Sequence, residues 1–112
     1  MADRATEIRR LRINENAAGV HQLVVVPAGH ELVLVSLHLS IADVQAAFLV
    51  QFQDTAVLLD CYMVTGVPHT LPENNGGWFR GNAAQNLSIV LAGNIATVGV
   101  MTYKLVPTGM EF

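Results

Sequence analysis

The chain has 112 residues, of which 52% are hydrophobic and only 13% are charged, and its net charge is −3. A chain of this length buries about two-thirds of the surface that its unfolded form exposes, so it has one hydrophobic core and no room for a second. Its charged fraction is about half of the roughly 25% that is typical of soluble domains. The longest apolar runs span a few residues. A membrane-spanning helix needs about 20, so no membrane partner is expected.

Basic residues are concentrated near the N-terminus. Arginines stand at Arg4, Arg9, Arg10 and Arg12, whereas the remainder of the chain is acidic. Charges occupy the place where a secretory signal needs an apolar segment, so no export peptide is expected. Residues 1–19 are interpreted as an N-terminal arm, or as a first strand followed by a turn, and a frayed terminus is an equal alternative. Three clustered arginines without interleaved aromatics do not predict a nucleic-acid partner.

Residues 20–112 carry the pattern of a β-sandwich domain. Residues 20–26 are rich in β-branched and apolar side chains, and they end at a Pro-Ala-Gly turn. In residues 31–40, the odd positions from Val33 to Leu39 are apolar, which is the period-two pattern of a strand with one buried face. The even positions of its first half are also apolar. That half is therefore expected to be covered on both faces.

The next strands show the same alternation. In residues 48–53, Phe48, Val50 and Phe52 are expected to face the core. A turn at Asp54 and Thr55 leads to a further strand over residues 56–64. Residues 41–47 have the composition of a single helical turn.

The last third of the chain begins with the strongest loop signal, the Pro-Glu-Asn-Asn-Gly-Gly segment at 72–77. Leu87, Ile89 and Leu91 are predicted to face inward from the strand that follows. Gly93 and Asn94 then predict a two-residue hairpin that returns as a strand over residues 95–106.

Together these segments predict about eight short antiparallel strands and no convincing helix. The spacing leaves no room for crossover helices, so the fold class is all-β, a single jelly-roll or β-sandwich domain with an N-terminal arm.

Catalytic motifs are missing from the sequence. Cys61 has no second cysteine to pair with, and in its strand-like surroundings it is interpreted as a small buried hydrophobe. The four histidines show no metal-binding spacing, and the absence of His-x-His argues against a cupin enzyme. His38 is expected to be a surface or interface residue and not a metal ligand. There is no Gly-x-Ser-x-Gly elbow and no phosphate loop. The protein is therefore predicted not to be an enzyme, and to need neither metal nor cofactor.

The most individual segment is Gly-Gly-Trp-Phe-Arg at 76–80. Trp78 and Phe79 are candidates for an interface anchor or for a sugar-stacking platform. The favoured interpretation is that Trp78 caps one end of the core and Phe79 begins a strand. Arg80 pairs with an acid across a subunit boundary or is solvated. Arg9, Arg10, Arg12, Trp78, Phe79 and Arg80 are the candidate residues for a subunit or capsid interface.

The order of segments resembles that of the head decoration (cement) proteins of tailed bacteriophages. The matching segments are a Val-Pro-Ala-Gly turn at 26–29, strands at 31–39, 87–91 and 99–106, and Gly-Gly-Trp-Phe at 76–79. The resemblance spans residues 20–106, and the N-terminal arm is not part of it.

The resemblance implies a jelly roll similar to the tumour-necrosis-factor fold. It further implies a homotrimer that binds the major capsid protein on the outside of a phage head. The expected location is the capsid surface of the virion, and the host cytoplasm during assembly. Two alternatives remain open at this point. One is a phage tail, fibre or carbohydrate-binding module, and the other is a small jelly-roll enzyme.

Overall fold

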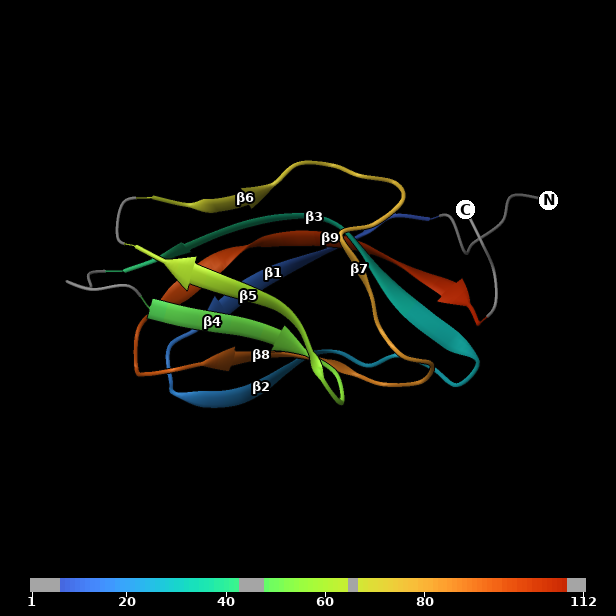
Figure 1. The fold of residues 1–112 in the computed structure, drawn as a ribbon, viewed down its shortest axis with the longest axis horizontal. Coiled ribbons are helices and arrows are strands. Elements are labelled where there is room, and N and C mark those ends of the chain that lie inside the picture. The colour runs from blue at the N-terminus through green and yellow to red at the C-terminus, as the bar shows by residue number, and fades with distance from the viewer. Residues whose placement is uncertain (1–6, 43–47, 65–66, 109–112) are drawn as a thin grey trace.

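The computed structural model describes residues 7–42, 48–64 and 67–108, and these residues form nine β-strands (Figure 1). The strands are β1 (Arg9–Glu15), β2 (Gly19–Val24), β3 (His30–Ile41), β4 (Phe48–Gln53), β5 (Val57–Met63), β6 (His69–Leu71), β7 (Phe79–Arg80), β8 (Leu87–Leu91) and β9 (Thr97–Pro107). Within the described residues there is no helix, and hence none that is long and apolar enough to cross a membrane. The helical turn was predicted over residues 41–47; Ile41 is the last residue of β3, and 43–47 lie outside the described residues.

The strands form two antiparallel sheets that pack face to face. Sheet A has the order β1-β9-β3-β6, with β7 also paired to β3, and sheet B has the order β2-β8-β4-β5. The chain changes sheet at every connection except those between β4 and β5 and between β6 and β7. Such repeated crossing between two sheets is the topology of a jelly roll. The predicted fold class is confirmed, and the two-residue β7 makes nine strands instead of about eight.

Strand β1 belongs to sheet A and pairs along its length with β9. Its alternation places Leu11 and Ile13 on the side of the core, where Ile13 is fully buried. Of the alternatives for the N-terminal segment, residues 9–15 therefore form the first strand. Strand β1 therefore contributes Ile13 to the core and also carries the exposed arginines Arg9, Arg10 and Arg12.

The core lies between the sheets and follows the predicted alternation in β4 and β8. Phe48, Val50 and Phe52 are buried on one side of β4, while the residues between them are partly exposed. The predicted inward residues of β8 are buried in the same way. Each strand therefore contributes one face to the core, as the period-two pattern requires.

A β-bulge in β3 changes the face that its odd positions occupy. Leu34 pairs with Tyr103 and Ser36 pairs with Thr102, so Val35 is the extra residue. Leu34 and Leu37 both pack in the core, but Val33 and Val35 are buried on the opposite face of sheet A. The prediction of one continuous odd-numbered face is wrong, because a bulge reverses the alternation. The prediction that the first half is covered on both faces is confirmed.

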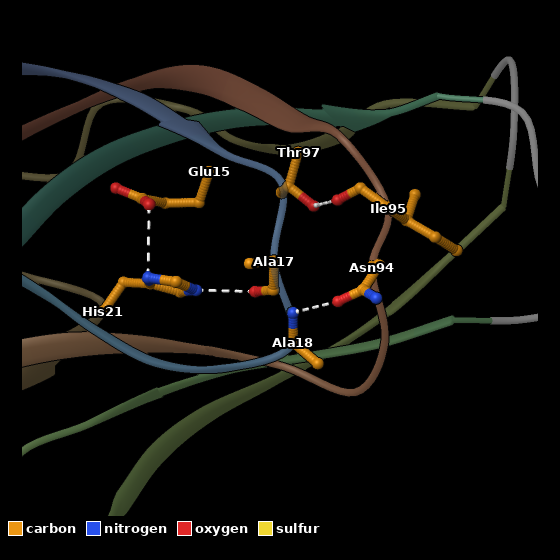
Figure 2. Close-up of polar contacts among 7 residues, drawn as sticks. All are labelled: Glu15, Ala17, Ala18, His21, Asn94, Ile95 and Thr97. Atoms are coloured by element: carbon orange, nitrogen blue, oxygen red, sulfur yellow. Dashed lines mark hydrogen bonds and ion pairs between the residues drawn. The ribbon is translucent and has the colours of Figure 1, made fainter.

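The predicted hairpin at Gly93 and Asn94 is also wrong. Strand β8 pairs with β2 and β4 in sheet B, whereas β9 pairs with β1 and β3 in sheet A. Figure 2 shows that this connection lies against the one between β1 and β2: the Asn94 Oδ1 atom accepts a 2.7 Å hydrogen bond from the Ala18 amide. On the same side, the His21 ring lies 3.2 Å from the Glu15 carboxylate. These contacts join the two sheets at one end of the sandwich.

Candidate interaction surfaces

The three arginines of β1 do not form one patch. Arg10 and Arg12 stand opposite Thr102 and Val100 of β9, on the face of sheet A that points away from the core. We call this the outer face of sheet A. Arg9 alternates with Arg10 and lies on the other side of the strand, although it too is exposed. Strand geometry therefore places two of the three predicted arginines, Arg10 and Arg12, on the outer face and Arg9 on the opposite side.

The predicted residues 78–80 lie beside β3, on the far side of sheet A from β1. Phe79 begins β7 and packs against the core, which confirms its predicted place. Trp78 does not cap the core: it is 42% exposed, and its indole Nε1 atom donates a 2.7 Å hydrogen bond to the Pro72 carbonyl. Arg80 pairs with Glu31 of the same chain. Strands β9 and β3 separate these residues from the arginines of β1.

Residues 72–78 form a loop that covers one end of the outer face of sheet A, and we call it the covering loop. The Asn74 amide donates to the Val35 carbonyl over 2.9 Å, and the Trp78 amide donates to Leu34 over 2.8 Å. Beneath the loop, the Lys104 Nζ atom donates to the Asn75 carbonyl over 2.8 Å, and only 5% of Lys104 is exposed. The loop explains why Val33 and Val35 are buried although they face away from the core.

Gly77 allows the covering loop to pack closely against Val33 of sheet A. It has a φ of +89°, which favours glycine, and a Cβ atom there would overlap the Val33 side chain. The sequence predicted a loop here from its Asn and Gly content. It did not predict that the loop packs on a sheet.

The outward side of sheet B carries apolar and uncharged polar side chains and one charge, and we call it the sheet B face. Across the sheet, Val20 stands opposite Val90, and Leu49 stands opposite Tyr62. Tyr62 is 69% exposed and Val20 is 61% exposed. In the four strands of this sheet the only formally charged residue is Asp60, which accepts a hydrogen bond from Gln51.

The residues of the sheet B face were not singled out from the sequence. Val20 and Tyr62 each stand next to a residue that faces the core, His21 in β2 and Cys61 in β5. Without the register, those residues look like additional core.

Cys61 and the histidines do not form a reactive centre in the described structure. Cys61 is fully buried, as predicted, and burial together with the charge of Asp60 raises the pKa of its thiol to about 12. The thiol is therefore protonated and unreactive at neutral pH. His38 is exposed, as predicted, and its Nδ1 atom lies 3.1 Å from the Thr70 hydroxyl. No three His, Cys, Asp or Glu side chains of the described residues are grouped so that they could hold a metal ion.

Asp54 joins the β4–β5 turn, which was predicted, to the segment after β7. Its carboxylate accepts hydrogen bonds from the amides of Ala56 (2.9 Å) and Asn82 (2.7 Å), and from the Asn82 side chain (3.0 Å). Partial burial of Asp54 raises its pKa, but these hydrogen bonds outweigh burial, and the net pKa is lowered. The ionised carboxylate therefore stabilises the fold.

Replacing Asp54 with asparagine is expected to lower the unfolding free energy at pH 6 by on the order of 1 kcal/mol, because an amide cannot accept all of these bonds. A lowered folded-state pKa contributes stability above the unfolded value of about 3.9 that is lost as pH falls through the folded value. The difference between wild type and Asp54→Asn should therefore shrink below pH 4. Urea unfolding across pH checks this, with Asp60→Asn as control. A difference that is independent of pH would contradict it.

Comparisons with known proteins assign no relationship: neither the scan against family models nor the search of curated proteins found a match.

Proposed function

We propose that the protein is a structural, non-catalytic component of a virion, which assembles as a homotrimer and decorates the outside of a tailed-phage head. The observation that carries the proposal is the sheet B face, with its exposed Val20 and Tyr62 and its single charge. Pairs of apolar side chains on an outward face, here Val20 with Val90 and Leu49 with Tyr62, favour an interaction site. The order of the segments, which resembles that of cement proteins, supports the phage head as the partner.

The outward direction of these side chains makes the proposal testable without disturbing the core. Val20 and Tyr62 alternate with residues that face the opposite sheet, so a charge at either position does not enter the interior. In an interface between copies, the same charge would be buried without a partner. Closed symmetric assembly then repeats that cost at every contact.

Tyr62→Lys is expected to weaken assembly roughly 30-fold, the equivalent of about 2 kcal/mol, which is typical of an aromatic interface residue. Sedimentation velocity of wild type should give the mass of a trimer, and Tyr62→Lys should shift the distribution to monomer with an unchanged circular dichroism spectrum. Val98→Lys is the matched control, because Val98 is exposed on the outer face of sheet A.

The same samples are then mixed with undecorated phage heads and pelleted. Wild type and Val98→Lys are expected to sediment with the heads, and Tyr62→Lys to remain in the supernatant. A wild-type protein that is monomeric at all concentrations would overturn the assembly. A trimer that does not pellet with heads would overturn the capsid partner and leave the assembly intact.

A further inference from the structure

The covering loop leaves part of the outer face of sheet A exposed, and we call this part the open half. Its side chains differ in chemistry from those of the sheet B face. Strand register places its outward side chains in three rows across β1, β9, β3 and β6. The rows are Arg10–Thr102–Ser36, then Arg12–Val100–His38–Thr70, then Asn14–Val98–Ser40. Neighbouring strands are about 4.8 Å apart, so the middle row spans about 14 Å.

Hydroxyl groups and basic groups dominate these rows. The Ser36 and Thr102 hydroxyls lie 2.5 Å apart in the first row, and the Thr70 hydroxyl contacts the His38 ring in the second. No Asp or Glu occurs in any of the three rows. On a chain with a net charge of −3, this half-sheet is therefore locally positive.

The two arginines stand side by side at one margin of this surface. Residues two apart on a strand share a face and are separated by about 7 Å. Neither Arg10 nor Arg12 forms an ion pair with a described residue. Guanidinium groups bind carboxylate, sulfate and phosphate groups through paired hydrogen bonds. This margin therefore suits two acidic groups of one ligand.

The opposite margin carries Trp78. Strand β6 ends with Leu71 opposite Leu37, the neighbour of Ser36, and Pro72 follows directly. The hydrogen bond from the indole to the Pro72 carbonyl fixes the ring at this place with nearly half of its surface exposed. A fixed aromatic ring offers a stacking platform that loses little conformational entropy on binding. The acid Glu73 lies in the same loop, which favours an uncharged part of the ligand there.

We propose that the open half of the outer face of sheet A binds an anionic oligosaccharide. Acidic groups of the sugar contact Arg10 and Arg12, ring hydroxyls bond to the serine and threonine hydroxyls and His38, and one sugar ring stacks on Trp78. This site is independent of the proposed assembly, which uses the other sheet. A polyanion without sugar rings would use the arginines but not the hydroxyls or the indole.

The test is calorimetric titration with oligogalacturonate, with neutral malto-oligosaccharide and poly-glutamate as comparison ligands. Oligogalacturonate is expected to bind, and Arg10→Gln and Arg12→Gln are each expected to weaken binding about 10-fold, as for the loss of a charged hydrogen bond. Arg9→Gln is the matched control: it removes the same charge from the same strand on the opposite side, and should bind as wild type does.

Trp78→Ala should also weaken binding of oligogalacturonate, and the variants' melting curves confirm that they are folded. Three results would each overturn the site. They are failure of oligogalacturonate to bind, equal weakening by Arg9→Gln, which indicates nonspecific attraction, and poly-glutamate that binds as tightly as the sugar. The first of these would leave the trimer and its mass unaffected, so the two proposals fail separately.

Discussion

Replacing Gly99 with alanine is expected to lower the unfolding free energy by about 3 kcal/mol or more, the upper range for overpacking a closed interior. Gly99 lies in β9 between Ile13 of β1 and Leu39 of β3. A Cβ atom there would overlap the His38 carbonyl oxygen and lie 3.0 Å from both the His38 carbonyl carbon and the Leu39 Cα. All three are backbone atoms, so no side chain can rotate away. The two central strands of sheet A would have to separate.

Equilibrium urea unfolding measures this effect, with Gly76→Ala as the control. The closest atom to a Cβ at Gly76 is the Asn74 Oδ1, at an ordinary 3.5 Å, so this variant should be nearly neutral. Since a domain of this size has a stability of about 5–15 kcal/mol, Gly99→Ala should have a greatly lowered midpoint or no folded baseline. A midpoint equal to that of Gly76→Ala would contradict the close approach of β9 and β3.

Deleting residues 1–13 is expected to abolish cooperative folding. The deletion removes Leu11 and Ile13 from the core, and truncating one buried isoleucine alone costs about 2–5 kcal/mol. It also leaves the β9 edge without the hydrogen bonds that β1 supplies. Near-ultraviolet circular dichroism and urea unfolding should both show loss of the native transition.

A second deletion, of residues 1–6 only, separates the strand from the segment that precedes it. This variant keeps all of β1 and should unfold with nearly the wild-type midpoint. If instead the chain without residues 1–13 retains the native spectrum, β1 is dispensable and its pairing with β9 contributes little. In either case, the arginines of β1 are best tested by substitution, because deletion removes core residues with them.

Local alternation was enough to predict the class of fold and much of the core. In β4 and β8, apolar and polar residues alternate cleanly, so the inward faces could be assigned from the sequence. In β3, Leu32 through Val35 are all apolar, and a bulge inside such a run leaves no mark on the pattern. The reversal at Val35 is visible only from its pairing with β9.

Connections between strands could not be predicted in the same way. Gly93 and Asn94 have the composition of a tight hairpin. Composition predicts that the chain turns there, but it does not predict to which sheet the next strand belongs. In this protein Asn94 contacts the β1–β2 connection instead. The two candidate surfaces share this limit, because each is assembled from strands that are distant in sequence. Arg12 and His38 stand on either side of Val100 in one row, an arrangement that only the register of sheet A reveals.

Lys104 is the only lysine of the chain, and its amine lies beneath the covering loop against the Asn75 carbonyl. A reagent that acylates lysine amines would find this group protected while the loop is closed. The rate of acylation at Lys104 would then measure how often residues 72–78 lift from sheet A. The protein thus contains a built-in chemical reporter for the loop that carries Trp78, with no label to introduce.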